Sequence, residues 1–413
     1  MDQLAIHGGP KVKTRAFGTG KRFGEEEKKQ LIEVIDDDML FYFFGKKVFA
    51  FQDAFAELHE MKHCIACSSG TAAVHIAIGT LQLKPGTEVI TSAITDMGSL
   101  TGMLYQNLIP VFADIDPRTY NMDPRSVEAC ITERTGAILV VHHAGLVADM
   151  DQFIAMSDRY HIPLIEDVAQ AYMGDYKGYL AGTMGEINAF SLNHFKHITC
   201  GSGGMVLTNS DEKRQLAALF LDKCYDREGG KRNPFFLAPN YQMTELQGAV
   251  ALAQLKKLPG IIERRRILGD RLTGYLQDIP GIMPQAIPEG TRHTYFLFLV
   301  RIDTDKLQVT TKEFSAALEA EGIPNSANLI TGGMPEYAYD IFKNRSAFPQ
   351  SQHPFVNKEF GTNISYRDTR CLQAEKAFKQ VINLQISEFY SDQDIEEMAQ
   401  AVEKVAHYYY KKN

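Results

Sequence analysis

Short apolar runs alternate with stretches of helical spacing through the first two-thirds of the chain. Between the apolar runs lie segments such as 123–134 and 150–161, whose apolar residues recur at helical intervals. Strands that alternate with helices predict right-handed crossovers and a mostly parallel sheet covered on both faces, with ligands at the carboxyl ends of its strands. The expected strands carry β-branched or aromatic residues between Gly, Pro or Asp, and they cover 87–94, 109–115, 136–145, 162–168, 187–193 and 204–209.

The last third of the chain has a different pattern. Residues 240–281 have long helical spacing that we expect to be broken at Pro259. A strand pattern follows at 294–302, and the final amphipathic helix should have Ser391 or Asp392 as its N-cap. The pattern predicts an α/β fold in three parts: an N-terminal arm (1–45), a large α/β domain (46–260) and a small C-terminal α+β domain (261–413).

Charge and composition narrow the class of partner. The 413 residues carry a formal net charge of −8 and no clustered Lys and Arg, which argues against a nucleic-acid partner and favours small molecules. The apolar runs are far shorter than a membrane span, and the first residues do not resemble a secretory signal. Six cysteines in a chain of this length suggest no disulfide framework, so we expect a cytoplasmic protein with no membrane partner.

Two pairs of residues have metal-like spacing. Cys64 and Cys67 form a C-x-x-C that would suit a redox or metal pair, but small buried residues in an apolar strand explain it better because no second cysteine pair has zinc spacing. His194 and His197 lie three residues apart, and without a nearby cluster of carboxylates or cysteines we favour packing roles for them. No metal site is therefore expected.

Two strand ends place polar groups where a ligand could bind. Ser68, Ser69, Gly70 and Thr71 lie between an apolar strand and a helix, where unpaired backbone N–H groups could bind a phosphate; a plain N-cap would look the same. Asp167 ends a buried strand, where a carboxylate needs a cation or a donor. A structural arginine would satisfy it equally well.

Lys196 changes the interpretation of these features. It lies in "SLNHFKHITCGSGG", five residues after Ser191 and shortly before a glycine-rich turn. A lysine amine, a buried carboxylate and a phosphate-binding turn are the groups that pyridoxal 5'-phosphate requires: one for the Schiff base, one to keep the pyridine nitrogen protonated, and one for the phosphate.

The order of these motifs resembles that of a known family. "SSGTAA", "PVFADIDPRTYNMDP", "VVHHAGLVADMD", "IEDVAQA", "SLNHFKHITCGSGG" and "NYQMTELQGAVALAQL" follow the landmarks of the DegT/DnrJ/EryC1/StrS sugar aminotransferases, pyridoxal phosphate enzymes of fold type I. The likeness runs from about residue 20 to residue 270 and is weaker beyond. It implies a mostly parallel, seven-stranded type of sheet in a large cofactor-binding domain.

The resemblance also implies roles for single residues. Lys196 would form the Schiff base, Asp167 would face the pyridine nitrogen, and Gln170 would lie beside the ring hydroxyl. Asn240 would reach the phosphate from the neighbouring subunit, which implies a homodimer with shared active sites. The remaining cofactor-binding residues would be Ser69, Gly70, Thr71 and Ser191.

The implied reaction moves an amino group from glutamate or glutamine to a ketone of a sugar or cyclitol. Two alternatives are a pyridoxal phosphate sugar dehydratase, in which a histidine commonly replaces the lysine, and a binding protein without turnover.

Two positions depart from the family pattern: Asp96 stands where an aromatic residue is usual, and Gln242 where an arginine is common. His142 matches a common family histidine without a clear role. The loss of charge at Gln242, together with an N-terminal arm like that of inosose-type members, favours an acceptor without a nucleotide.

Overall fold

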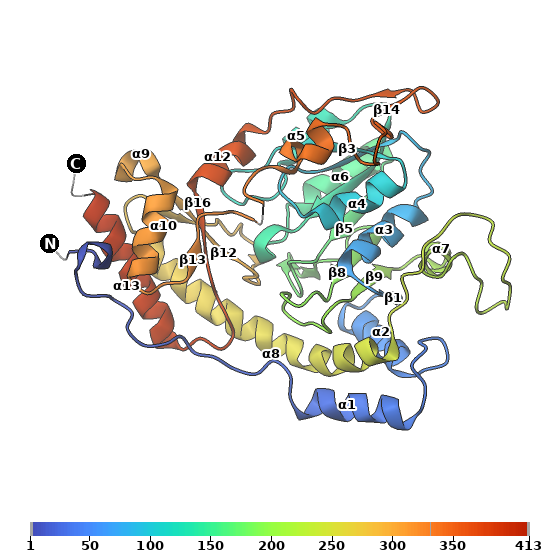
Figure 1. The fold of residues 1–413 in the computed structure, drawn as a ribbon, viewed down its shortest axis with the longest axis horizontal. Coiled ribbons are helices and arrows are strands. Elements are labelled where there is room, and N and C mark those ends of the chain that lie inside the picture. The colour runs from blue at the N-terminus through green and yellow to red at the C-terminus, as the bar shows by residue number, and fades with distance from the viewer. Residues whose placement is uncertain (1–2, 331, 411–413) are drawn as a thin grey trace.

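The computed structural model describes residues 3–330 and 332–410. Its largest sheet has seven strands in the order β1-β9-β8-β5-β4-β2-β3 (Figure 1). β2, β3, β4, β5 and β8 run parallel, whereas β9 pairs antiparallel with β8 and β1. The strands are β1 (His63–Cys67), β2 (Glu88–Ser92), β3 (Ile109–Ala113), β4 (Thr135–Val141), β5 (Leu164–Asp167), β8 (Ile187–Ser191) and β9 (Gly204–Thr208).

Helices cover both faces of this sheet. Every residue of β2, β5, β8 and β9 is buried, so neither face of the sheet centre contacts water. Polar caps begin several of the helices: Asp123 precedes Pro124 at the start of α5, and Ser210 accepts a hydrogen bond at the start of α7. The predicted α/β class is confirmed. The helices are α2 (Lys47–Leu58), α3 (Gly70–Thr80), α4 (Met97–Tyr105), α5 (Pro124–Cys130), α6 (Met150–Tyr160) and α7 (Asp211–Leu221).

A second, smaller sheet lies at the other end of the molecule, on the left in Figure 1. Its order is β10-β12-β16-β13, and it has a hydrophobic core separate from that of the large sheet. Ser391 caps the last helix through the Asp394 backbone amide, as predicted, and Asp392 is its first residue. The elements are β10 (Ile282–Pro284), β12 (Phe298–Ile302), β13 (Asn325–Ser326), β16 (Val381–Leu384), α9 (Thr304–Leu307), α10 (Thr311–Ala320) and α13 (Asp392–Tyr410).

The remaining helices and strands lie outside the two larger sheets. The loop-rich stretch expected near 324–370 contains only brief helices and strands, and much of it packs on the core of the large sheet. The short elements are α1 (Glu25–Asp36), β6 (Asp175–Tyr176), β7 (Tyr179–Leu180), β11 (Thr291–Arg292), α11 (Asp340–Lys343), β14 (Val356–Asn357), β15 (Thr362–Asn363) and α12 (Leu372–Gln380). None of the helices within 3–330 and 332–410 has the length and apolar character needed to cross a membrane.

The expected helix break at Pro259 is wrong. Helix α8 (Glu245–Leu276) continues through this proline and extends from one core to the other (Figure 1). A proline inside a helix costs about 3 kcal/mol. Buried side chains such as Leu258 in the first core and Leu272 in the second hold the helix on both sides of it and offset that cost. The domain boundary near residue 260 falls within α8, and the three-part division stays a prediction.

Two strand predictions are too long. β4 ends at Val141, because Ala144 has a φ of 62° and the chain turns there in a short 3-10 helix. β12 begins only at Phe298, because the Thr294 backbone amide donates to the carbonyl of Gly145 rather than to a strand. The residues after β4 and the residues before β12 therefore meet at the carboxyl edge of the large sheet.

The C-x-x-C pair lies in β1, as the packing interpretation expects. Cys67 is fully buried, and burial raises the pKa of its thiol to about 12. Burial also raises the pKa of the Cys64 thiol well above its ordinary value. Both thiols therefore stay protonated at neutral pH and act as small apolar groups in the strand.

Candidate active site

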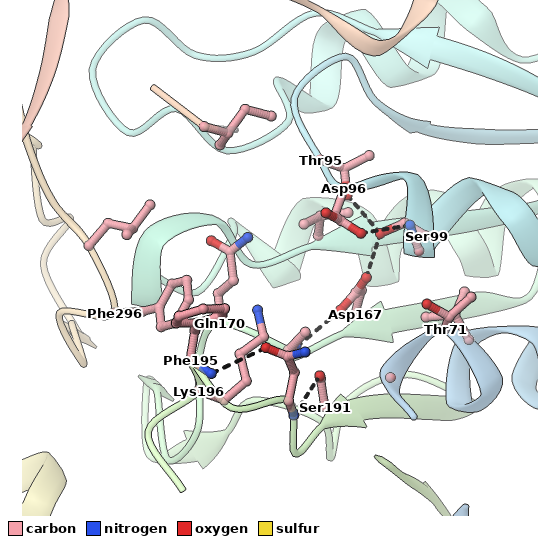
Figure 2. A pocket seen from close by; sticks show the side chains of 18 of the residues that line it. Thr71, Thr95, Asp96, Ser99, Asp167, Gln170, Ser191, Phe195, Lys196 and Phe296 are labelled. Atoms are coloured by element: carbon pink, nitrogen blue, oxygen red, sulfur yellow. Dashed lines mark hydrogen bonds between the residues drawn. The ribbon is translucent and has the colours of Figure 1, made fainter. Parts of the chain in front are cut away.

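A cavity of about 660 Å³ opens at the carboxyl ends of β5 and β8 and at the first turns of α3 and α4 (Figure 2). Among the described residues that line it, Lys196 is the one cation, and Asp96 and Asp167 are the two carboxylates. Seven of the eight predicted site residues line this cavity: Ser69, Gly70, Thr71, Asp167, Gln170, Ser191 and Lys196. The sheet thus brings together residues that span more than 120 positions of the sequence.

Lys196 lies in the turn that follows β8. Its Nζ is 4.5 Å from the centre of the Phe296 ring, and no hydrogen bond or ion pair of Nζ occurs within the described part of the chain. Burial lowers the pKa of this amine, while the charges of Asp167 and Asp96 oppose the shift. A lowered pKa makes the neutral, nucleophilic form of a lysine more accessible.

Asp167 ends β5 and points into the same cavity (Figure 2). Its Oδ2 accepts a hydrogen bond of 2.7 Å from the Ser99 hydroxyl, and its Oδ1 accepts one of 3.0 Å from the Ala169 amide. Since Ser99 gives its proton to Asp167, the Thr95 hydroxyl, 2.7 Å away, must donate to Ser99. Burial raises the pKa of the Asp167 carboxyl, against these two hydrogen bonds and the charge of Lys196.

The first turn of α3 forms a small polar cradle beside Ser191. Ser69 accepts a 3.0 Å bond from the Ala72 amide, so its oxygen is an N-cap while its hydroxyl proton can still be donated. A Cβ added at Gly70 would lie 2.7 Å from the Ser191 Oγ, so only glycine allows this close approach. Thr71 is exposed to the cavity, and the unpaired amides of the helix start favour an anion there.

Gln170 has a fixed orientation. Its Oε1 accepts a 2.8 Å bond from the amide of Ala144, the residue with positive φ. The side-chain NH₂ of Gln170 is thereby left as the group that can donate to a ligand in the cavity.

Asn240 does not line the cavity within one chain. It is exposed and forms a β-bridge with Asp222, in a segment that also exposes Phe235 and Leu237. Gln242 forms a bridge with Cys67, and its Nε2 is buried without a hydrogen-bond partner in the described part of the chain. A role of Asn240 at the phosphate would require a second subunit and stays a prediction.

The histidines have structural surroundings. His142 accepts from the Ala148 amide through Nδ1, so its Nε2 donates to Glu166 at 2.8 Å, with both side chains fully buried. His197 is buried against the rings of Tyr172 and Phe296, and His194 is exposed. The burial of His197 agrees with the expected packing role, whereas the exposed His194 does not pack in the interior.

Sequence reasoning missed several residues that the cavity brings together. Ser99 is three residues after Asp96, which caps α4 by accepting from the Gly98 amide at 2.8 Å. A cap signal followed by a buried serine at a helix start could have indicated it. Phe296 lies in a long apolar run with no distinguishing signal. Glu336 is not among the described lining residues, but its fully buried carboxyl is influenced by the charge of Asp96, and its oxygens have no hydrogen-bond partner among the described residues.

The sequence of the chain also matches known proteins. The model of the DegT/DnrJ/EryC1/StrS aminotransferase family matches residues 21–353. The chain belongs to this family. It is therefore a pyridoxal phosphate-dependent aminotransferase of fold type I, as the motifs predicted.

Individual relatives cover nearly the whole chain. The spore coat polysaccharide biosynthesis protein SpsC of Bacillus subtilis is 30% identical over 391 residues, which are 92% of this chain and 95% of SpsC. A proposed L-glutamine:3-amino-2,3-dideoxy-scyllo-inosose aminotransferase of Streptoalloteichus tenebrarius is 30% identical, covering 91% of this chain and 90% of its own. The crystal structure of 3-amino-5-hydroxybenzoic acid synthase superposes with a TM-score of 0.81 at 25% identity, covering 96% of this chain and 100% of that one.

The cavity fits the cofactor of this family. Gly70 lies close to Ser191, and a Cβ at this position would fill the polar cradle between them. Because glycine has no Cβ, the backbone amides and hydroxyls of the cradle can face a phosphate. The amine of Lys196 and the carboxylate of Asp167 face the same space. Asp96 caps α4 and leaves a carboxylate on the cavity wall.

Proposed function

We propose that the protein transfers an amino group from glutamate or glutamine to a ketone of a sugar or cyclitol, and that Lys196 and Asp167 carry out the chemistry. The observation that carries this proposal is that both side chains line one cavity with the first turn of α3. When bound, pyridoxal phosphate supplies an aldehyde that takes up amines and a ring that withdraws electrons from the bonds beside them.

The residues of the chain have distinct tasks in this proposal. Lys196 would hold the cofactor covalently through Nζ, and this amine, once released, would take the proton from Cα of the donor. Asp167, held by Ser99 and the Ala169 amide, would keep a proton on the pyridine nitrogen. Ser69, Gly70, Thr71 and Ser191 would hold the phosphate, and the NH₂ of Gln170 would face the ring hydroxyl.

For the acceptor we propose a cyclic ketone that is free or carries at most one phosphate. Lys196 is the one cation among the described lining residues, and a diphosphate linker would favour additional Arg or Lys. Neither Lys46 nor Lys47 is among the described lining residues, and each is paired elsewhere: Lys46 binds Asp37 at 3.0 Å, and Lys47 binds Glu33. The Streptoalloteichus tenebrarius relative is named for an amino-dideoxy-scyllo-inosose acceptor, which supports the same class.

We also propose a homodimer in which Asn240 completes the neighbouring active site. The segment that carries Asn240 exposes Phe235 by 72% and Leu237 by 94%, and such apolar side chains are typical of a covered interface. Free rather than disulfide-bonded cysteines suit a reducing, cytoplasmic compartment.

A spectrophotometric screen tests the proposed function. The purified yellow protein is converted to its amine form with glutamate or glutamine, and candidate ketones are then added to find which restores the original absorbance. The proposal expects higher kcat/KM for scyllo-inosose or a ketohexose phosphate than for a nucleotide-linked 3- or 4-ketosugar. A clear preference for the nucleotide-linked ketone would refute the acceptor class, and the absence of a half-reaction with both glutamate and glutamine would refute the proposed donors.

A further inference from the structure

The guanidinium of Arg22 binds the turn that carries Lys196. Nη1 donates to the carbonyl of His194 at 2.5 Å, and Nη2 donates to the carbonyls of Lys196 and, at 3.0 Å, of His197. One planar side chain thus contacts three carbonyls within four residues. A guanidinium can do this because its five N–H groups have fixed directions in one plane.

Arg22 is itself held in place on its other side. Its backbone carbonyl accepts from Gln254 Nε2 at 2.9 Å and from Lys257 Nζ at 3.0 Å, both on α8. The same two side chains bind Glu27 of α1, at 2.7 and 2.5 Å. The guanidinium therefore projects from a point fixed by two helices.

The turn needs such a contact because its own hydrogen bonds are mostly local. The Lys196 amide donates to the Asn193 carbonyl at 2.9 Å, and the Phe195 amide donates to the Asn193 side chain at 3.2 Å. Phe195 is 79% exposed, so this part of the turn is not held by packing. His197, through Thr294, is a further attachment of the turn to the rest of the fold.

We infer that Arg22 is a positioning residue for Lys196, which ties the turn of the reactive lysine to the N-terminal arm and α8. This inference rests on the proposed function of Lys196. The backbone of Lys196 determines where its Nζ enters the cavity, and small misplacements of reacting groups cost large factors in rate. Arg22 is not among the described residues that line the cavity, and it contacts Lys196 at the backbone carbonyl, so it acts through the backbone.

The arm that carries Arg22 crosses from the small sheet to the large one (Figure 1). Near the small sheet, Lys13 is buried and binds Asp394 at 2.7 Å and Glu397 at 2.6 Å. Arg15 binds the same two carboxylates with a side chain that is 48% exposed. Arg15 is therefore a matched control, since it is an arginine of the same arm that does not contact the turn.

The test compares Arg22→Gln, Arg22→Lys and Arg15→Gln in the cofactor-loaded full chain. The readouts are the rate of the first half-reaction with glutamate, the pH at which the cofactor–lysine absorbance changes, and the melting temperature. Arg22→Gln should slow the half-reaction by about 10- to 100-fold and shift the absorbance titration, because Nζ leaves its place beside Phe296. Arg15→Gln should stay within about twofold of wild type in rate, with an unshifted titration.

Arg22→Lys covers the case in which the glutamine variant does not fold. It keeps the charge but offers a compact ammonium to three carbonyls, so an intermediate rate is expected. Wild-type rates and titrations in both Arg22 variants would overturn the inference. So would a half-reaction rate in Arg15→Gln that falls as far as the rate in Arg22→Gln, with no shift of the absorbance titration. Borohydride reduction of the cofactor-loaded wild type, followed by peptide mass spectrometry, separates the two proposals. Cofactor trapped on Lys196 would support the proposed function whatever the Arg22 variants do. Cofactor trapped on another residue would overturn both proposals.

Discussion

Ser99→Ala is the change that most directly tests how the fold controls Asp167. Ser99 is buried, and its hydroxyl supplies one of the two hydrogen bonds to the Asp167 carboxylate. Alanine removes that donor with little change in volume and leaves the Thr95 hydroxyl without its acceptor. The variant therefore weakens the ionised form of Asp167 more than its neutral form.

The size of the effect follows from the kind of bond lost. A hydrogen bond to a charged group contributes about 1.5–3 kcal/mol, which corresponds to about 10- to 100-fold in the ratio of ionised to neutral carboxyl. Burial already raises the pKa of Asp167, and the loss of Ser99 raises this pKa further. Because the ionised form is the active one, we expect the loss of activity to be largest at acid pH and to shrink as pH rises.

The assay is the pH profile of kcat/KM for the first half-reaction with glutamate. The acid limb of Ser99→Ala should move to higher pH, and Ser99→Thr, which keeps the hydroxyl, should recover part of the difference. Thr101→Ala is the matched control, because the Thr101 hydroxyl of the same helix bonds to the Met97 carbonyl and to no other group of residues 3–330 and 332–410. An acid limb of Ser99→Ala that coincides with that of wild type would refute this account of Asp167.

Four further predictions concern the site and its surroundings. Lys196→Ala should abolish the cofactor–lysine absorbance, and retention of that absorbance with normal turnover would reassign the reactive amine. Asp167→Asn should keep the cofactor but lower the rate by more than about 100-fold, which steady-state kinetics with a normal cofactor content would check. Mixing Lys196→Ala chains with Asn240→Ala chains should restore about a quarter of wild-type activity through heterodimers with one intact site, and no recovery after subunit exchange would indicate sites built within single chains. Burial raises the pKa of Glu336 to about 8, above its value in the unfolded chain. The apoprotein should therefore lose about 1.4 kcal/mol of unfolding free energy per pH unit as the pH rises from about 4.5 to 8. Denaturation of Glu336→Gln should show no such dependence on pH.

The order of strands and helices in the large sheet could be predicted from the sequence because local patterns determine them. Buried parallel strands read as continuous apolar runs, so the strand predicted over 162–168 contains β5, and the polar residues Ser68–Thr71 mark the place where α3 begins. The motif around Lys196 identified the family, since the cofactor requires a lysine, a carboxylate and a phosphate cradle in a given chain order. These features depend on residues that are neighbours in sequence or belong to one recurring pattern.

Only the tertiary structure decided which distant residues serve those motifs. The Ser99 hydroxyl reaches Asp167 across 68 residues, and Phe296 approaches Lys196 from a segment outside the large sheet. Pro259 stays inside a continuous helix because two separate cores hold α8 on either side of it. Arg22 meets the turn of Lys196 because the arm crosses from one sheet to the other. Contacts of this kind depend on how whole elements pack, which no local pattern encodes.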